Sequence, residues 1–229
     1  MSSDRVFLIT GASTGIGAAT ARQAAAAGFR LVLAARSTDK LQALSDELGG
    51  PERALAVACD VTEWEQVESL AQETLDTFGQ IDVVFANAGF GATRGFQNET
   101  PEHWKSMVLT NVLGPAYTIR ATMDAVKATK GHYLLTSSVA GRRALPGSLY
   151  SSTKHAVTAM AESLRQELND TGVRVTSIEP GMVDTPFFDN RPTNALEADD
   201  IARAVMYAVA QPGHVDINEI LIRPTAQPT

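Results

Sequence analysis

A glycine-rich turn close to the N-terminus most constrains what this chain can fold into. An apolar run at 6–9 leads into the turn Thr10–Gly17, and a helix-like stretch from Gly15 to Ala27 follows. A strand, a glycine turn and a helix in this order make a site where the amides at the helix N-terminus can face a phosphate. The spacing departs from the common GxGxxG, because three residues separate Gly11 from Gly15. We predict a dinucleotide-binding turn whose contact residues are Gly11, Ser13, Thr14, Gly15, Ile16 and Gly17.

Short apolar runs alternate with longer helical segments along the rest of the chain. Helical segments are expected at Trp64–Phe78, Pro101–Thr129 and Leu149–Thr171. Strands that alternate with helices pair in parallel through crossovers, which places helices on both faces of the sheet. Unbroken apolar strands fit a sheet that is covered on both sides, so we predict a doubly wound, Rossmann-type α/β fold with a parallel sheet of about seven strands. The expected strands are Arg5–Thr10, Arg30–Ala35, Ala54–Cys59, Ile81–Ala86, His132–Thr136, Arg174–Ile178 and Glu219–Ile222.

The size and the charge of the chain narrow its class and its partners. With 229 residues, of which 44% are hydrophobic, the chain can bury one substantial core. No Ser/Gly linker, charged block or repeat marks a boundary, so residues 1–229 are expected to form a single dinucleotide-binding and catalytic domain. A net charge of -7 argues against nucleic acid or an anionic membrane as the main partner.

The cysteine and histidine residues indicate the cellular compartment of the protein and whether it can hold a metal ion. Cys59 is the only cysteine, so no internal disulfide can form, and its apolar neighbours favour a core thiol. No apolar stretch approaches the length of a membrane span, and the N-terminal residues do not form a signal peptide. His103, His132, His155 and His214 share no metal-ligand spacing, so no metal site is expected. We predict a reducing, cytoplasmic compartment.

Polar or turn-forming residues follow five successive expected strands, from the second to the sixth. They are Arg36, Asp60 with Val61, Asn87 with Ala88 and Gly89, Ser137 with Ser138, and Pro180 with Gly181. Each set taken alone fits an ordinary turn or a helix stop. In a doubly wound sheet, however, the carboxyl ends of the strands converge on one crevice, where ligands bind. The joint occurrence at successive strand ends therefore predicts a single site.

Tyr150 and Lys154 form the strongest catalytic signal in the sequence. A spacing of four residues places both side chains on one face of a helix, close enough for the ammonium to act on the phenol. A free tyrosine titrates near pKa ~10, and a nearby cation favours the phenolate, so we expect Lys154 to lower the pKa of Tyr150. The same oxygen then serves as general acid and base. Such pairs also occur by chance in surface helices, and the glycine turn and the upstream Ser-Ser pair give this one its weight.

The whole set of motifs resembles the short-chain dehydrogenase/reductase family, in its single-domain branch. The resemblance runs from about Arg5 to the C-terminus. The motifs that carry it are TGASTGIG at Thr10–Gly17, Asp60, NAG at Asn87–Gly89, Asn111, SSVAG at Ser137–Gly141, YSSTK at Tyr150–Lys154 and PGMVDT at Pro180–Thr185. The resemblance implies a nicotinamide dinucleotide and hydride transfer to or from a small-molecule carbonyl or alcohol. It also suggests a homodimer or homotetramer joined through Pro101–Thr129 and Leu149–Thr171.

The resemblance assigns four catalytic roles. Tyr150 donates a proton to the carbonyl oxygen in reduction and accepts one in oxidation, while Lys154 lowers the pKa of Tyr150 and hydrogen-bonds the nicotinamide ribose. Ser138 holds the substrate oxygen, and Asn111 holds a water that links Lys154 to solvent. The family usually places its serine thirteen residues before the tyrosine, which corresponds to Ser137, whereas the local Ser-Val-Ala-Gly pattern favours Ser138. We choose Ser138 and retain Ser137 as the alternative.

The cofactor preference depends on the end of the second expected strand. Family members that prefer NAD usually carry an aspartate where this chain has Ala35, and Arg36 follows with a guanidinium suited to a 2′-phosphate. NADP(H) is therefore the expected cofactor and NAD(H) the alternative, with a solvated Arg36 as the competing explanation. The resemblance implies that Asp60 accepts a hydrogen bond from the adenine amino group, and the alternative is that Asp60 forms a turn before Thr62. It also implies that Thr185 contacts the nicotinamide carboxamide, and the alternative is that Thr185 caps the short segment before Pro186. The further cofactor positions are Val61, Asn87, Ala88, Gly89, Tyr150, Lys154, Pro180, Gly181 and Val183.

The substrate is less constrained than the cofactor. A short lid is expected at about 182–196, where Phe187 and Phe188 either line an apolar pocket or only pack the lid. Arg142 and Arg143 either face the mouth of the site and bind a carboxylate or lie in solvent. The ending of the chain resembles that of family members that oxidise 3-hydroxy acids or serine.

We expect an enzyme that interconverts a ketone or aldehyde with its alcohol. A cofactor-binding sensor without turnover is one alternative, although such proteins usually lose the tyrosine or the lysine. A sugar epimerase or dehydratase shares the pair, but a chain of 229 residues leaves little room for its larger C-terminal substrate region. A 3-hydroxy acid or serine dehydrogenase is the narrower enzyme interpretation.

Overall fold

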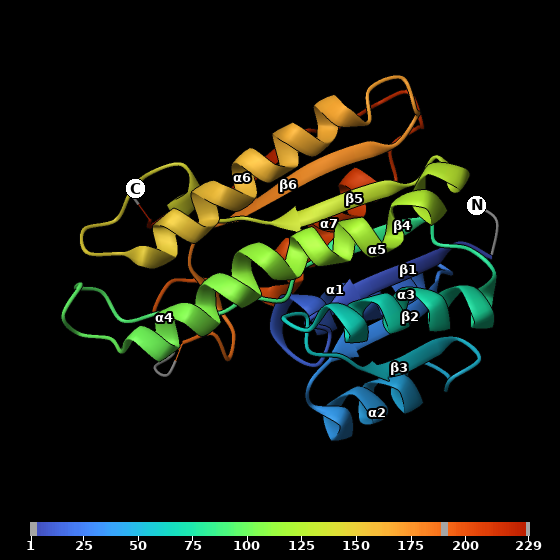
Figure 1. The fold of residues 1–229 in the computed structure, drawn as a ribbon, viewed down its shortest axis with the longest axis horizontal. Coiled ribbons are helices and arrows are strands. Elements are labelled where there is room, and N and C mark those ends of the chain that lie inside the picture. Colours follow the sequence, from blue (N-terminus) through green and yellow to red (C-terminus); the bar gives the residue numbers. More distant parts are fainter. Residues whose placement is uncertain (1–3, 189–191, 228–229) are drawn as a thin grey trace.

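A parallel sheet of seven strands forms the centre of the computed structural model, which describes residues 4–188 and 192–227 (Figure 1). The strands lie in the spatial order β3-β2-β1-β4-β5-β6-β9, and every neighbouring pair is parallel. Their bounds are β1 Val6–Thr10, β2 Arg30–Ala35, β3 Ala54–Ala58, β4 Val83–Ala86, β5 His132–Thr136, β6 Arg174–Pro180 and β9 Glu219–Ile222. The predicted doubly wound sheet is confirmed.

Helices cover both faces of this sheet and divide the hydrophobic core in two (Figure 1). The first group is α3 Trp64–Phe78, α5 Gly114–Thr129 and α6 Leu149–Glu167, and the second is α1 Gly15–Ala26, α2 Thr38–Glu47 and α7 Ala198–Val209. Alternate residues of β1 supply both cores, because Val6 and Leu8 face the first group while Phe7 and Ile9 face the second. All four are fully buried, as an unbroken apolar strand requires. No helix among the described residues is long and apolar enough to cross a membrane.

The strand order creates a switch point at β1. The chain runs from β1 outward to β2 and β3, and then returns to β4 on the other side of β1. At such a point the connections leave the sheet in opposite directions, which opens a crevice outside the carboxyl ends of the strands. The glycine turn follows β1 and Asn87 follows β4, so both border this crevice.

The long helix predicted at Pro101–Thr129 is divided by a π-helical turn. The helix α4 spans Pro101–Val108, the π-helical turn η1 spans Leu109–Leu113, and α5 follows directly. Pro115 has no N–H to donate to the carbonyl oxygen of Asn111, four residues earlier, so regular α-helical bonding cannot continue through this point. The helical stretch predicted at Pro101–Thr129 is confirmed in its bounds, and the π-helical turn within it was not predicted.

Several boundaries differ from the sequence prediction by one or more residues, and those of β6 and α6 are examples. The strand β6 continues past Ile178 to Pro180, because its last residues still pair with β9. The helix α6 ends at Glu167 and not at Thr171, and Asp170 already adopts a left-handed φ of 64°. The longer β6 carries the sheet up to the edge of the crevice.

Candidate functional site

The glycine turn after β1 brings backbone segments closer together than a side chain would allow. Gly11 has a left-handed φ of 66°, and a Cβ there would lie 2.9 Å from the Cα of Ala88. A Cβ on Gly17 would lie 2.3 Å from the carbonyl oxygen of Gly11. The first turn of α1 therefore lies close against the end of β4. Its amides have no acceptor within the helix, and such a helix N-terminus favours a phosphate.

A cleft of about 450 Å³ lies beside this turn. Ser13, Thr14 and Gly15 line one side, and Asp184 and Thr185 of the segment after β6 line the other. Thr185 lies directly against the turn, because a Cβ on Gly15 would be 3.2 Å from the Cβ of Thr185. Four of the residues predicted to bind the cofactor thus border one cleft. The glycine turn and the hydroxyl groups that line this cleft fit the phosphate of a dinucleotide.

Asn87 joins the ends of three neighbouring strands. Its side-chain amide donates to the carbonyl oxygen of Thr10 at 3.1 Å, and its side-chain oxygen accepts from the hydroxyl of Thr136 at 3.2 Å. The Thr10 hydroxyl accepts in turn from the backbone amides of Asn87 and Ala88. The side chain of Asn87 is thus engaged within the protein and fixes the edge of the crevice, and its contact with the cofactor stays a prediction.

The residues expected around the adenosine end of the cofactor follow β2 and β3. Arg36 is exposed, and no carboxylate of the described residues pairs with it. Asp60 accepts from the amide and the hydroxyl of Thr62, at 3.0 and 2.9 Å, as the turn alternative predicts. Val61 is buried in the core, and a Cβ on Gly114 would lie 2.8 Å from its Cγ2. The side chain of Val61 therefore packs against the start of α5 and presents little surface to an adenine ring.

Tyr150 and Lys154 project from the first turns of α6, as their spacing predicts. Ser148 caps this helix by accepting from the amide of Ser151 at 3.1 Å. Tyr150 is half-buried, and Lys154 is buried. The Nζ of Lys154 lies 5.6 Å from the centre of the Tyr150 ring and donates to the carbonyl oxygen of Thr136 at 2.7 Å. The pair thus meets the carboxyl end of β5.

Burial dominates the electrostatics of this pair. It raises the pKa of Tyr150 to about 12, and the nearby hydroxyl of Ser138 opposes the rise. Burial also lowers the pKa of Lys154 to about 8, because the ammonium loses its hydration. Burial is the dominant influence on the pKa of Tyr150 in this arrangement, and the lowering of that pKa by Lys154 stays a prediction. Tyr150 is therefore held in its proton-donating form at neutral pH.

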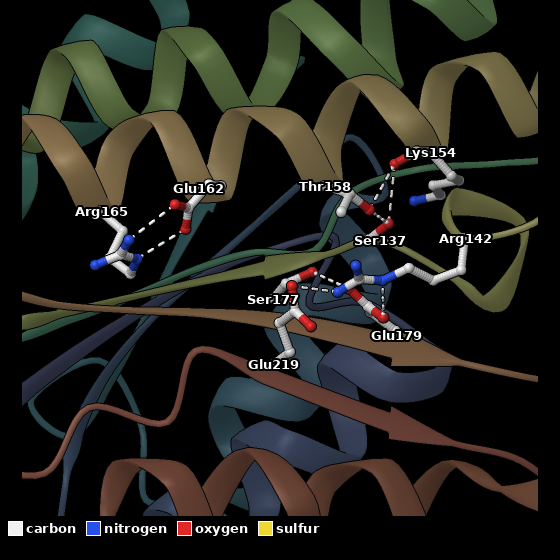
Figure 2. A network of polar contacts seen from close by, with 9 residues as sticks. All are labelled: Ser137, Arg142, Lys154, Thr158, Glu162, Arg165, Ser177, Glu179 and Glu219. Atoms are coloured by element: carbon white, nitrogen blue, oxygen red, sulfur yellow. Dashed lines mark hydrogen bonds and ion pairs between the residues drawn. The ribbon is translucent and has the colours of Figure 1, made fainter.

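The two candidate serines after β5 make different contacts. The hydroxyl of Ser137 is buried, donates to the carbonyl oxygen of Lys154 at 2.9 Å and hydrogen-bonds Thr158 at 2.7 Å (Figure 2). The hydroxyl of Ser138 instead lies close enough to Tyr150 to lower the pKa of its phenol. The geometry therefore favours Ser138 as the serine that accompanies the tyrosine, and it gives Ser137 a packing role.

Asn111 lies in η1 close to Lys154. Its side-chain amide donates to the carbonyl oxygen of Phe90 at 2.9 Å and to the hydroxyl of Thr153 at 3.1 Å, and its side-chain oxygen accepts from the amide of Phe90 at 3.0 Å. A Cβ on Gly89 would lie 3.1 Å from this oxygen and 3.6 Å from the Nζ of Lys154. Because the side chain is engaged within the protein, a water at Asn111 would have to bind its backbone carbonyl.

Phe187 lies over Tyr150 at the side of the site. The centres of the two rings are 5.6 Å apart in an edge-to-face arrangement, and Phe188 lies 5.0 Å from Phe187. A Cβ on Gly91 would lie 2.8 Å from the Phe187 ring, and Nε2 of His103 hydrogen-bonds the carbonyl oxygen of Gly91 at 3.0 Å. Gly91 and His103 are neighbours of the site that the sequence analysis missed, because no motif connects them to the other residues.

Arg142 lies with its guanidinium between Glu179 and Glu219 (Figure 2). Its guanidinium donates to the carboxylate of Glu179 at 2.7 and 2.8 Å and also pairs with Glu219. The hypothesis that Arg142 binds a substrate carboxylate is therefore wrong, because the protein itself supplies both of its partners. Arg143 is exposed, as its solvated alternative predicts.

The segment expected to form a lid folds back onto the body of the protein. Its strands β7 Val183–Asp184 and β8 Leu196–Glu197 pair in parallel, and the amide of Met182 donates to the side-chain oxygen of Gln227 at 2.8 Å. The hydroxyl of Thr185 accepts a long hydrogen bond, of 3.4 Å, from the backbone amide of Phe187, as its capping alternative predicts. Part of the expected lid, residues 189–191, lies outside the described residues.

Cys59 and His155, whose side chains could in principle act as a nucleophile or a metal ligand, have structural roles. Burial raises the pKa of the Cys59 thiol to about 11, so Cys59 is the expected core thiol. The ring of His155 hydrogen-bonds the carbonyl oxygen of Ser151 at 2.8 Å. In the part of the chain that the structure describes, no group of His, Cys, Asp and Glu is arranged to hold a metal ion.

A model of the short chain dehydrogenase family matches residues 5–196 of this sequence. The chain belongs to the short chain dehydrogenase family. The family membership that the motifs indicate is therefore confirmed. An uncharacterized oxidoreductase of Staphylococcus epidermidis is 37% identical over 226 residues, which cover 96% of this chain and 97% of that protein. This member of the family is thus an oxidoreductase.

Solved structures share the fold of this short chain dehydrogenase. An alcohol dehydrogenase of Thermococcus sibiricus, complexed with 5-hydroxy-NADP, has a TM-score of 0.89 and 35% identity, with 97% of each chain covered. A serine dehydrogenase complexed with NADP+ has a TM-score of 0.89 and 29% identity, covering 97% of this chain and 96% of that one. Other similar structures hold NAD or NADH. A nicotinamide dinucleotide is therefore the supported cofactor class, and the glycine turn fits it.

Proposed function

We propose that this chain is an NADP(H)-dependent oxidoreductase that interconverts a ketone or aldehyde with its alcohol. The observation that carries the proposal is that Tyr150, Lys154 and Ser138 lie together at the sheet edge that also carries the glycine turn. Two hydroxyl groups side by side can both donate to one carbonyl oxygen. We assign Tyr150 as the general acid and base, assisted by Lys154, Ser138 and Asn111.

The proposed proton transfer follows from the surroundings of Tyr150. The bound nicotinamide supplies a hydride in reduction and accepts one in oxidation. In reduction, Tyr150 gives its proton to the carbonyl oxygen, which Ser138 orients. Tyr150 carries this proton at neutral pH, because its pKa lies far above 7. Lys154, with its pKa lowered to about 8, is suited to stabilise and then reprotonate the phenolate, and the backbone carbonyl of Asn111 holds the water that links Lys154 to solvent.

The proposed preference for NADP(H) rests on the end of β2. Arg36 is exposed and has no acidic partner among residues 4–188 and 192–227, so its charge is available to a 2′-phosphate. Ala35 offers no carboxylate to repel that phosphate. NAD(H) is the alternative, since similar structures were solved with either dinucleotide.

The proposed substrate is a small, uncharged carbonyl compound or alcohol. Phe187 and Phe188 give the site an apolar wall over Tyr150, and the charge of Arg142 is compensated by Glu179 and Glu219. The second candidate is oxidation of serine or a 3-hydroxy acid, which similarity to a serine dehydrogenase favours. In that case Arg143, the residue after Arg142, would offer an exposed cation close to the serine motif.

The proposal also includes the larger organisation of the protein. Residues 1–229 form one catalytic domain, with the segment 182–196 as the substrate lid. Members of the family often oligomerise, and we propose a homodimer or homotetramer joined through α4, α5 and α6, where Val108 of α4 is an exposed apolar side chain. The cytoplasmic location stays a prediction from the lone, unpaired Cys59.

The test is consumption of NADPH and NADH, measured side by side, against ketones, aldehydes, keto esters and 3-oxo acids. Serine and 3-hydroxy acids are run in the oxidative direction with NADP and NAD. We expect turnover of uncharged carbonyl compounds with a higher kcat/KM for NADPH. Turnover of serine or 3-hydroxy acids alone would support the second candidate, and cofactor binding without any turnover would support the sensor alternative.

A further inference from the structure

Glu179 is a fully buried carboxylate on β6. Its oxygens accept from the guanidinium of Arg142 at 2.7 and 2.8 Å and from the hydroxyl of Ser177 at 2.9 Å (Figure 2). A buried charge is tolerated when it is paired and hydrogen-bonded in this way. The two parallel bonds fix both the distance and the orientation of the arginine. The position of Arg142 is therefore tied rigidly to β6.

Arg142 is also joined to Ser138 through a short and tightly packed 3-10 turn. Ser138 caps this turn by accepting from the amide of Ala140 at 3.1 Å. The last residue of the turn, Gly141, has no room for a side chain, because a Cβ there would lie 2.7 Å from the carbonyl oxygen of Lys154. The connection between the serine and the arginine therefore has little freedom to adjust if either end moves.

The segment from Ser137 to Arg142, called the serine segment below, bonds three consecutive residues of β6. The amide of Ser137 donates to the carbonyl oxygen of Ile178 at 2.8 Å, and the hydroxyl of Ser138 donates to that of Pro180 at 3.3 Å. The ion pair with Arg142 provides a third tie, at the residue between these two acceptors. Of the three, the ion pair is the only charged interaction, and charge-assisted bonds are the stronger kind.

We propose that Arg142 and Glu179 are positioning residues, which hold the hydroxyl of Ser138 in register with Tyr150. The inference rests on the proposed function, because the pair acts through the serine and touches no reacting atom. A hydrogen bond to a reacting oxygen stabilises the transition state only when its donor is correctly placed. A loss of the pair therefore lowers the rate of the chemical step more than it weakens cofactor binding.

The test is a kinetic cycle that combines the ion pair with the serine. Arg142→Met alone would leave the carboxylate of Glu179 buried and unpaired, so the variant used is Arg142→Met/Glu179→Gln, which removes both charges. With Ser138 present, we expect this double variant to lower kcat by about tenfold or more, with the Kd for NADPH within about twofold. In a Ser138→Ala background the same change should alter kcat by less than about twofold, because the residue that transmits the effect is gone. Equal losses in the two backgrounds would overturn the inference.

The matched control is the ion pair between Arg165 and Glu162 on α6, which has bonds of 2.7 and 2.8 Å (Figure 2). It lies in solvent and makes no bond to the serine segment. Arg165→Met/Glu162→Gln should leave kcat within about twofold of wild type. A wild-type protein without turnover would refute the proposed function itself, whereas a wild type with turnover and equal losses in the cycle would refute only the positioning role.

Discussion

Tyr150 shows how the environment of one residue sets its chemistry. The side chain is half-buried at the start of α6, near the hydroxyl of Ser138, with Lys154 beside its ring. Its pKa of about 12 makes it a proton donor at neutral pH. Oxidation of an alcohol needs the phenolate instead, which must be formed against the cost of burial. Reduction can therefore start from the protonated form in which Tyr150 is found, whereas oxidation has first to form the phenolate.

Tyr150→Phe removes the acid without changing the packing of the ring. We expect kcat to fall by about a thousandfold, because a positioned general acid contributes on that scale, while the Kd for NADPH stays within about twofold. Steady-state kinetics and a fluorescence titration with NADPH measure the two quantities. Tyr207→Phe, at an exposed tyrosine of α7, is the matched control and should behave as wild type. A Tyr150→Phe variant that keeps near wild-type kcat would contradict the acid/base assignment.

Lys154 makes the stability of the fold depend on pH. Burial lowers its pKa from 10.5 to about 8, so the folded state binds fewer protons than the unfolded state between these pH values. The buried charge therefore costs stability below pH 8, and this cost disappears as the pH rises toward 10.5. Lys154→Met should raise the free energy of unfolding by about 1–3 kcal/mol at neutral pH, with a gain that shrinks at higher pH. Urea unfolding of both proteins across this range measures the difference, and a constant difference would argue against the lowered pKa.

Elements with strong local signals were predictable from the sequence. The seven strands and the start of α4 at Pro101, capped by Thr100, agree with apolar runs and capping rules. The π-helical turn was not predicted, although Pro115 is visible in the sequence. A proline can begin, kink or end a helix, and only the contacts of Asn111 with Phe90 and Thr153 show which of these occurs here.

Gly17→Ala tests the glycine turn as an element. The added Cβ would lie 2.3 Å from the carbonyl oxygen of Gly11, so the turn would have to open. We expect a loss of stability of about 1–3 kcal/mol and an NADPH affinity at least about tenfold weaker, since the amides of α1 are displaced. Calorimetry of binding and thermal unfolding measure these effects. Gly213→Ala is the control, because its Cβ meets no atom of the described residues within 4 Å, and an equal effect in both variants would contradict the prediction.

At the scale of the whole molecule, the crevice depends on the order of the strands. The glycine turn after β1 and Asn87 after β4 meet only because β1 and β4 are neighbours in the sheet. A dinucleotide bound across this crevice contacts several strand ends at once. Its binding energy therefore adds to the stability of the whole fold.

This coupling makes cofactor preference measurable without a substrate. At about 100 times its Kd, NADPH should stabilise the protein by about 2.7 kcal/mol, seen as a rise in Tm. NADH at the same concentration should give a smaller rise. Arg36→Asp should reduce the NADPH effect and leave the NADH effect intact or larger, because the 2′-phosphate then faces a carboxylate. Lys127→Asp, at an exposed lysine at the end of α5, controls for net charge, and an equal NADPH effect in wild type and Arg36→Asp would contradict the role of Arg36.

The sequence alone determined the fold class, the glycine turn and the spacing of Tyr150 and Lys154, because each depends on residues close together in the chain. The tertiary structure decided the partners of Arg142 and Asn87, which lie 37 residues away in Glu179 and 77 residues away in Thr10. It also brought Ser138 to Tyr150, which the spacing along the chain left open. Contacts between distant segments are set by how strands and helices pack, and a one-residue shift along a strand exchanges the side chains that face a neighbour.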